Sequence, residues 1–398
     1  MEHKTRIKGN VHYVGVNDRN KHRFEAMWPL PYGVSYNSYL IDDEMVALVD
    51  TVDICYFEVY LRKIKQVIGE RPINYLIINH MEPDHSGSIR LIKQHYPEII
   101  IVGNKQTFGM IEGFYGVTGE QYLVKEGDFL ALGHHKLRFY MTPMVHWPET
   151  MMTFDETDGV LFSGDGFGCF GTVDGGFLDT RINVDKYWGE MVRYYSNIVG
   201  KYGSPVQKAL QKLGGLPISA ICSTHGPVWT ENIAKVIGIY DRLSRYDADE
   251  GVVIAYGSMY GNTEQMAEAI AEELSAQGVK NIVMHNVTKS HPSYIIADIF
   301  RYKGLIIGSP TYSNQIFPEV EALLSKILLR EVKGRYLGCF GSFAWAGAAV
   351  KRLAEFAEKS KFELVGDPVE MKQAMKDLTY TQCENLARAM ADRLKKDR

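Results

Sequence analysis

Cysteine is scarce in this chain and never paired in a C-x-x-C motif. The five cysteines are scattered: Cys55, Cys169, Cys222, Cys339 and Cys383. An odd number of isolated cysteines is typical of reduced thiols in a cytoplasmic protein. Their spacing also argues against a cysteine-ligated zinc or iron–sulfur module within the chain. We therefore interpret each one as a small buried apolar residue.

Long apolar runs and an excess of positive charge are also missing. No stretch of about 18 apolar residues is present, so the sequence predicts no membrane span. The first eight residues contain no apolar signal core, which makes export unexpected and favours a cytoplasmic location. The formal net charge of −4 provides no basic face for nucleic acid. The sequence contains no internal repeat and no low-complexity tract.

The 398 residues are enough for two domains, and the sequence pattern changes near residue 248. The polar segment Tyr246–Glu250 resembles an interdomain link. We therefore expect one domain over residues 1–248 and another over 249–398. In the second, a buried strand (Val252–Tyr256) precedes an amphipathic helix (Thr263–Gln277), and strands and helices then alternate. That alternation predicts an α/β fold with a doubly wound parallel sheet.

The first domain shows short strand-like runs separated by Gly, Pro and Asp, with helix-like stretches between them. The runs are Val46–Val49, Tyr75–Ile78, Ile99–Val102, Leu137–Met141, Val160–Phe162 and Ala220–Cys222. The expected helices cover Phe57–Ile68, Asp185–Val199 and Asn232–Tyr246.

A cluster of polar residues follows the second of these runs. Two imidazoles and two carboxylates occur within His80-Met81-Glu82-Pro83-Asp84-His85. A solvated, inert loop would rarely hold four ligand-type side chains in six residues. Imidazole and carboxylate together suit Zn, Fe or Mn, and no thiolate is present to favour a softer metal. The sequence therefore predicts a metal-binding loop here.

Three other strand-like runs also end in ligand-type residues, namely His146, Asp165 and His225. A lone histidine in such a place is more often structural than a ligand. Strand ends at one edge of a sheet converge, however, so these side chains can meet the first cluster. Seven ligands are too many for one ion and suit two ions about 3.5–4 Å apart. Asp165 is the best candidate for a bridge, because a carboxylate offers two oxygens.

The second domain contains three loops at strand ends that suit a phosphate and a flat ring. The first loop, residues 257–264, matches neither a Walker loop nor the G-x-G-x-x-G pattern. Its hydroxyl and backbone N–H groups can bind a phosphate at the N-terminus of the following helix. The alternative is that Asn262 or Thr263 only caps that helix. The later loops contain Tyr312, Phe343 and Trp345, whose rings suit a flat ring on a monophosphate tail, as in FMN. The predicted FMN-binding residues are Ser258, Met259, Tyr260, Gly261, Asn262 and Thr263, then Ser309, Pro310, Thr311, Tyr312, Ser313 and Asn314, then Ser342, Phe343, Ala344, Trp345, Ala346 and Gly347.

The metal motifs resemble those of the metallo-β-lactamase fold, an αββα sandwich, in which the usual hydrolase loop reads H-x-H-x-D-H. Here Glu82 replaces the second histidine. The second half resembles flavodoxin, and the fusion of the two looks like a flavodiiron protein over nearly the whole chain. This resemblance implies one iron at His80, Glu82 and His146, another at Asp84, His85 and His225, and a bridge at Asp165.

The resemblance also suggests residues beside the metals. In some family members the position that matches His85 does not ligate. Some members have a histidine near the metals in the region of residues 24–37, and Glu25 would take that place here. Tyr195 resembles a tyrosine behind the ligands and would donate a hydrogen bond during turnover.

A redox-active diiron pair gives the attached flavin a purpose that redox-inert zinc would not. The resemblance therefore implies reduction of dioxygen to water, of nitric oxide to nitrous oxide, or both. It also implies a separate electron donor, rubredoxin or a reduced deazaflavin, and a head-to-tail homodimer or a homotetramer. Two other functions remain open on the residues alone. One is a dizinc hydrolase with an accessory flavodoxin domain, and the other is an electron carrier with a structural metal.

Overall fold

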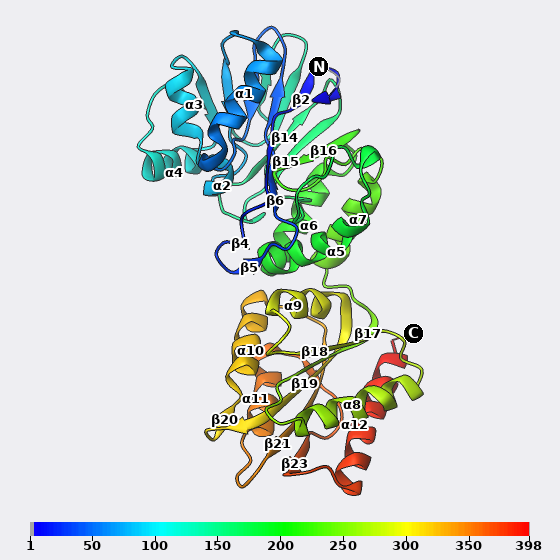
Figure 1. Ribbon diagram of the computed structural model, residues 1–398. Coiled ribbons are helices and arrows are strands. Elements are labelled where there is room, and N and C mark those ends of the chain that lie inside the picture. Colours follow the sequence, from blue (N-terminus) through cyan, green and yellow to red (C-terminus); the bar gives the residue numbers. More distant parts are fainter. Residues whose placement is uncertain (1–3, 398) are drawn as a thin grey trace. The chain divides into compact units, whose positions relative to one another are not determined.

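The computed structural model describes residues 4–397, which form two compact units (Figure 1). The first unit ends at Ser244 and the second begins at Arg245. The sequence pattern placed this boundary slightly later, between residues 248 and 249. The polar link is the reason for the difference, because it packs on the second unit. The Tyr246 carbonyl accepts a hydrogen bond from Arg335 at 2.9 Å, and its ring lies 6.0 Å from that of Phe300.

Two sheets face each other in the first unit. The seven-stranded sheet has the order β1-β2-β7-β8-β9-β10-β11, and the five-stranded sheet has the order β12-β13-β14-β15-β16. Their strands are β1 (Arg6–Lys8), β2 (Val11–Tyr13), β7 (Tyr39–Ile41), β8 (Ala47–Val49), β9 (Tyr75–Ile77), β10 (Ile100–Gly103), β11 (Gln121–Leu123), β12 (Phe129–Ala131), β13 (Lys136–Met141), β14 (Met151–Asp155), β15 (Val160–Gly164) and β16 (Ala220–Ser223). Two short pairs lie outside them: β3 (Val16–Asp18) with β6 (Val34–Tyr36), and β4 (Arg23–Phe24) with β5 (Trp28–Pro29).

Apolar side chains from both sheets form one core between them. Val49 and Ile77 from the first sheet pack in the same cluster as Leu137, Phe162 and Cys222 from the second. These residues occupy strands that the sequence predicted from their apolar runs. Burial of apolar area on this scale is the main term that holds two sheets face to face.

Helices cover the outer faces of the two sheets. On one side lie α1 (Phe57–Ile68), α3 (Ile89–His95) and α4 (Lys105–Tyr115), and on the other α5 (Asp185–Tyr194), α6 (Gly203–Leu213) and α7 (Ile233–Ser244) (Figure 1). In α1, Phe57, Tyr60, Ile64 and Ile68 are buried at helical spacing, as expected for one inward face. The predicted αββα sandwich is therefore confirmed.

Two of the expected helices differ in detail. The stretch predicted as one helix over Asp185–Val199 is α5 followed by a π-helix, Tyr195–Val199. The wider π turn changes which side chains face inward, a detail that apolar spacing alone does not reveal. The last helix, α7, is shorter at both ends than the predicted range Asn232–Tyr246.

The second unit is a doubly wound sheet with the order β18-β17-β19-β21-β22, in which β23 extends β21 in parallel and β20 pairs antiparallel with β19. Its strands are β17 (Asp249–Tyr256), β18 (Ile282–Asn286), β19 (Tyr302–Tyr312), β20 (Gln315–Ile316), β21 (Tyr336–Phe343), β22 (Glu363–Leu364) and β23 (Val369–Lys372). Helices α8 (Asn262–Ala276) and α12 (Asp377–Lys395) pack on one face, and α9 (Pro292–Arg301), α10 (Pro318–Arg330) and α11 (Ala349–Ser360) on the other (Figure 1). This is the flavodoxin-like order, so the fold prediction is confirmed for this unit too. Within residues 4–397, no helix is long and apolar enough to cross a membrane.

Candidate functional site

The structure brings all seven predicted metal ligands together. His80 and Glu82 follow β9, and the short helix α2 (Pro83–Ser86) carries the next two ligands. The others follow β13, β15 and β16, so loops from both sheets meet at one end of the sandwich. The buried set consists of His80, Glu82, Asp84, His85, His146, Asp165 and His225.

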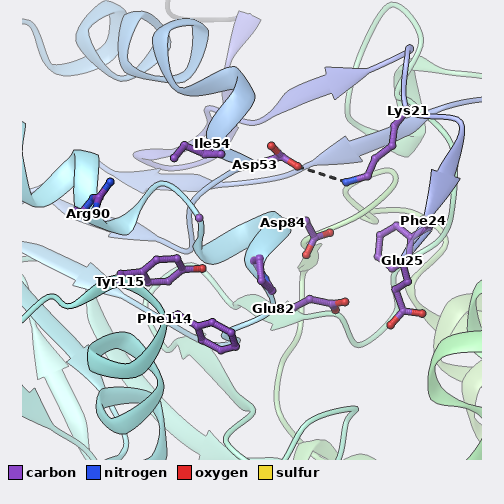
Figure 2. Close-up of a pocket in the computed structure, with 12 residues that line it drawn as sticks. Lys21, Phe24, Glu25, Asp53, Ile54, Glu82, Asp84, Arg90, Phe114 and Tyr115 are labelled. Atoms are coloured by element: carbon purple, nitrogen blue, oxygen red, sulfur yellow. Dashed lines mark hydrogen bonds and ion pairs between the residues drawn. The ribbon is translucent and has the colours of Figure 1, made fainter. Parts of the chain in front are cut away.

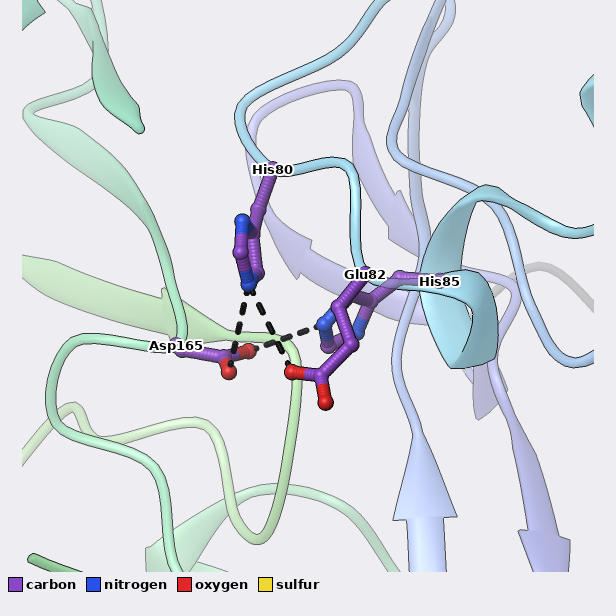
Figure 3. A group of neighbouring side chains, drawn as sticks. All are labelled: His80, Glu82, His85 and Asp165. Carbon is purple, nitrogen blue, oxygen red and sulfur yellow. Dashed lines mark ion pairs between the residues drawn. The ribbon is translucent and has the colours of Figure 1, made fainter. Parts of the chain in front are cut away.

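One group of ligands faces Oδ2 of Asp165. His146 Nε2 lies 2.9 Å from this oxygen, and His80 Nε2 lies 3.7 Å from it. The Glu82 carboxylate completes the group, with Oε2 at 3.2 Å from His146 and 3.5 Å from His80. In Figure 3 the His80 ring and the Glu82 and Asp165 carboxylates point toward one another.

A second group faces Oδ1 of the same carboxylate. His85 Nε2 lies 3.0 Å from Oδ1, and His225 Nε2 lies 3.7 Å from it. Asp84 spans these histidines, with Oδ1 at 3.3 Å from His85 and Oδ2 at 3.3 Å from His225. Each group therefore has two imidazoles, one carboxylate and one oxygen of Asp165.

The carboxylates strongly affect the histidines of this cluster. Burial by itself lowers the pKa of His146, but the hydrogen bond to Asp165 and the nearby Glu82 carboxylate outweigh it and raise the pKa to about 9. Burial likewise opposes the charged form of His85, yet the Asp84 and Asp165 charges raise its pKa to about 9. In the absence of a metal cation, protons on these histidines therefore compensate the negative charge of the carboxylates. A metal ion must displace those protons, so metal binding here releases protons.

The polar atoms at the centre fit metal ions. Several buried nitrogens and oxygens have no hydrogen-bond partner among residues 4–397, and a buried polar atom without a partner is costly. These atoms are Nε2 of His80, His85 and His225, Oε2 of Glu82 and both carboxylate oxygens of Asp84. Lone pairs that converge without donors favour cations, and nitrogen and oxygen ligands suit iron. A bridging carboxylate between two such groups suits two ions rather than one.

Two outer contacts orient the histidines, and the sequence did not reveal them. His80 Nδ1 lies 2.7 Å from Oε1 of Glu149, a fully buried carboxylate three residues after His146. His225 Nδ1 instead donates to the backbone carbonyl of Ser35 at 2.7 Å. Both contacts turn Nε2 toward the centre, where the ring can offer its lone pair to a metal ion. The chain distance between His80 and Glu149 explains why no local pattern could have linked them.

Asp50 fixes the backbone of the metal loop. Its carboxylate accepts hydrogen bonds from the Asn79 backbone N–H at 2.8 Å and from the Asn79 side chain at 3.2 Å. Burial raises the pKa of Asp50 to about 6, although the neighbouring His85 charge and the Asn79 hydrogen bonds oppose the rise. The residue also has a φ of 52°, a left-handed conformation that costs energy for a non-glycine residue. Its position directly after a strand-like run was the only sequence signal.

The tyrosine whose hydroxyl contacts Asp165 is Tyr194, the neighbour of the Tyr195 that the sequence predicted. The Tyr194 hydroxyl donates to Oδ2 of Asp165 at 2.8 Å. The Tyr195 ring instead packs edge-on against Tyr240, with centroids 5.0 Å apart. Neighbouring residues in a helix differ by about 100° in direction, so their order in the sequence could not decide between them. On the other oxygen, Thr224 donates to Oδ1 of Asp165.

A cavity of about 420 Å³ opens onto Glu82 and Asp84, and Figure 2 shows both carboxylates pointing into it. Glu25 lies on its wall at the tip of the β4–β5 hairpin, where Trp28 Nε1 donates to it at 2.9 Å. The turn has three residues, and two of them, Glu25 and Ala26, have positive φ values of 48° and 57°. Asn and Gly are the residues that usually take successive positive φ values in a hairpin turn, so the present sequence holds Glu25 there at some conformational cost. Burial and the nearby Glu82 charge raise the pKa of Glu25.

The second unit has a cavity of about 470 Å³ at the carboxyl ends of its strands. Most residues of the three predicted loops line it, including Thr263, Tyr312 and Trp345. Helix α8 begins beside it, so its N-terminal N–H groups are available to a phosphate. Tyr260 and Trp345 are 88% and 86% exposed, and such open aromatic rings suit stacking against a flat ring.

Three predicted flavin-loop residues do not line this cavity. Gly261 has a φ of 89° and shapes the turn before α8, while the Ser309 hydroxyl is buried and accepts the Phe317 N–H. Gly347 lies close to Glu370 instead. Gln373, which the sequence did not indicate, lines the cavity from the residue after β23.

Comparison with known proteins supports both halves of this description. The model of the ODP family beta lactamases matches residues 34–226, and the flavodoxin model matches residues 254–386. The anaerobic nitric oxide reductase flavorubredoxin of Vibrio vulnificus is 32% identical, over 90% of this chain and 73% of its own length. The Escherichia coli O1:K1 protein of the same name is 31% identical, over 90% of this chain and 76% of its own.

Solved structures agree over nearly the whole chain. The rubredoxin oxygen:oxidoreductase of Desulfovibrio gigas has a TM-score of 0.93 and 31% identity and covers 97% of both chains. The flavodiiron protein of Giardia intestinalis has a TM-score of 0.91 and 26% identity, over 98% of this chain and 97% of its own. Together with the paired ligand groups around Asp165 and the cavity lined by flavodoxin loops, these similarities show that the chain belongs to the flavodiiron proteins, oxidoreductases that carry FMN and a non-haem diiron centre.

Proposed function

We propose that this protein reduces dioxygen to water, nitric oxide to nitrous oxide, or both. The observation that carries the proposal is the division of ligands around Asp165, with one group on each carboxylate oxygen. A carboxylate shared in this way can hold two ions close together, so one substrate can contact both. The names of the Vibrio vulnificus and Desulfovibrio gigas relatives indicate the same two gases.

The electron supply suits these reactions. When bound, two iron ions give one electron each and reduced FMN gives two, which equals the four electrons needed to reduce dioxygen to two water molecules. Reduction of two nitric oxide molecules to nitrous oxide needs two electrons and two protons. A dizinc hydrolase would use neither the flavin nor the electrons.

The ligand assignment is part of the proposal. We assign His80, Glu82 and His146 to one iron, and Asp84, His85 and His225 to the other, with Asp165 between them. His85 is included because its Nε2 points to the centre and has no hydrogen-bond partner among residues 4–397.

Glu25 and Tyr194 are suited to handle protons near the substrate. Glu25 lines the cavity onto which the metal ligands open, and its raised pKa favours the protonated form that can donate. The Tyr194 hydroxyl already donates to Asp165 and holds the bridging carboxylate in place. Glu25→Gln should lower turnover without a change in iron or FMN content.

Anaerobic stopped-flow mixing of the fully reduced enzyme with each gas tests the function. We expect rapid oxidation of flavin and iron by at least one gas, with water or nitrous oxide as product. Stoichiometric zinc together with hydrolysis of a thioester, lactone or phosphodiester would instead support the hydrolase. Slow oxidation by both gases with peroxide as the only product would support a simple electron carrier.

We also propose a head-to-tail homodimer, alone or as part of a tetramer, in the cytoplasm. The ligand and flavin loops belong to separate units, so electrons must cross between units, and a second copy can bring one site to the other. Cysteine-ligated metal modules are not expected in this chain, so a separate donor such as rubredoxin or a reduced deazaflavin would supply FMN. Sedimentation combined with activity measurements tests the assembly, because a fully active monomer would contradict it.

A further inference from the structure

The two groups of metal ligands have the same composition but different surroundings. Each has two imidazoles, one carboxylate and one oxygen of Asp165. Behind the first group lies a further carboxylate, Glu149, which contacts the His80 ring at 2.7 Å. Behind the second group, His225 Nδ1 donates to the neutral carbonyl of Ser35, and the Asp50 carboxylate near His85 receives no hydrogen bond from an imidazole of the described residues. Among the described residues, Glu149 is therefore the only carboxylate that receives a hydrogen bond from the outer ring nitrogen of a histidine in this cluster. It lies behind the first group and has no counterpart behind the second.

Glu149 has few other partners within the described part of the chain. It is 0% exposed, and its only ion-pair partner is His80. Its Oε1 also accepts the Met81 N–H at 2.9 Å, whereas Oε2 has no hydrogen-bond partner. A buried carboxylate with so little compensation is costly, and a cation beyond the imidazole would reduce that cost. A carboxylate behind a ligating histidine also makes the ring a stronger electron donor to a metal.

We propose that Glu149 makes the two metal positions unequal. The position formed by His80, Glu82 and His146 then holds its ion more tightly than the position formed by Asp84, His85 and His225. The extra negative charge also favours the more highly charged state of that ion, so the first position has the lower reduction potential. This inference rests on the ligand assignment proposed above.

Single-site backgrounds provide the test. His225→Ala weakens the second position, and His146→Ala weakens the first. In each background, Fe²⁺ is titrated anaerobically into the metal-free, FMN-loaded protein against a competing chelator. Glu149→Gln should lower the affinity about 10- to 100-fold in the His225→Ala background. It should leave the affinity in the His146→Ala background unchanged. Equal losses in both backgrounds, or no loss in either, would overturn the proposal.

Asp50→Asn is the matched control. This carboxylate accepts hydrogen bonds from the backbone N–H groups of Asn79 and His80 and from the Asn79 side chain, but none from an imidazole among residues 4–397. Asp50→Asn should not lower the Fe²⁺ affinity in the His225→Ala background alone. If it does so, the contact between Glu149 and His80 is not the cause of the loss seen with Glu149→Gln. Far-UV circular dichroism and FMN content verify folding. If Glu149→Gln does not fold, Glu149→Asp replaces it, because Asp keeps the negative charge on a shorter side chain. Glu149→Asp should lower the Fe²⁺ affinity by a smaller factor, and only in the His225→Ala background. Any other pattern contradicts the proposal.

Mössbauer spectra of the wild type and Glu149→Gln, both loaded with two irons, give a second measurement. One of the two iron signals should change and the other should not. A change in both signals to the same extent would contradict an effect confined to one position. If neither His225→Ala nor His146→Ala removes an ion, the ligand assignment itself fails, whatever Glu149 does.

Discussion

The metal site and the flavin site are built in opposite ways. The proposed metal ligands come from four separated segments between His80 and His225, and every one is buried. The proposed flavin cavity is formed mainly by three loops at one sheet edge, with Tyr260 and Trp345 almost fully exposed. One site is enclosed by the core of its unit, and the other lies open at the end of a sheet.

This difference has an energetic consequence. Buried lone pairs without partners are costly until an ion arrives, so iron binding and the stability of the first unit should be coupled. Polar groups of the flavin loops already form hydrogen bonds with one another, as between the Thr263 and Ser342 hydroxyls at 2.9 Å. Loss of FMN should therefore leave its unit folded. The following experiments test this contrast.

Removal of the shared ligand should have the largest effect. Asp165→Ala takes away the oxygen on each side of the bridge, so iron content should fall from two to well below two per chain. His225→Ala should affect mainly one ion. FMN content should not change in either variant, because FMN binds the other unit. Metal analysis and flavin absorbance provide the measurements, and full iron occupancy with unaltered turnover in Asp165→Ala would exclude the bridge.

The flavin unit should fold and bind FMN on its own, without nitric oxide reductase activity. A fragment from Arg245 should be more stable than one from Asp249, because Arg335 would lose the Tyr246 carbonyl. Arg335 is almost fully buried, but its Nη1 also donates to the carbonyls of Lys333 at 2.7 Å and Gly334 at 3.3 Å. The lost hydrogen bond should therefore cost only about 0.5–1.5 kcal/mol of unfolding free energy. Urea unfolding compares the two fragments. Nitric oxide reduction by either at the full enzyme's rate would show that the metals are not required.

A change in the phosphate loop should weaken FMN binding only. Thr263 is buried beside the start of α8, and Thr263→Leu replaces its hydroxyl with apolar bulk. The FMN dissociation constant should rise about tenfold or more, the equivalent of one lost hydrogen bond to a charged group. Fluorescence titration measures it, and iron content should be unaffected. Thr288→Leu, at an exposed residue outside the cavity, is the control and should bind FMN normally.

The smallest effect should be a pH dependence in the metal unit, away from the metals. Burial opposes the charged form of His135, but the hydrogen bond to Asp155 at 2.9 Å raises its pKa overall. A raised pKa stabilises the folded state below the unfolded pKa of about 6.5, and this stabilisation is lost as pH rises through the folded pKa. The stability advantage of the wild type over His135→Asn should therefore be larger at about pH 6 than at about pH 8. Urea unfolding at matched iron content measures it, with exposed His134→Asn as the control. An advantage that grows with pH would contradict the assigned pair.

Local sequence was informative wherever a strand runs directly into a functional loop. The cluster from His80 to His85 and the strand ends at His146, Asp165 and His225 identified the residues that the structure brings together. The three flavin loops were readable for the same reason, since ligands bind beyond the carboxyl ends of parallel strands. In both units, apolar runs defined the strands, and their polar ends defined the sites.

Tertiary structure alone decided the contacts that cross the sandwich or depend on rotation. Glu149 reaches His80 because β9 and the loop before β14 meet in space, although 68 residues separate His80 from Glu149 in the chain. Tyr194 rather than Tyr195 faces Asp165 because the axial rotation of α5 follows from its packing, and the π turn begins after it. The sequence by itself thus determined which residue types lie at the strand ends and which fold carries them. The partners that orient those residues were decided by packing between distant segments, which no local pattern encodes.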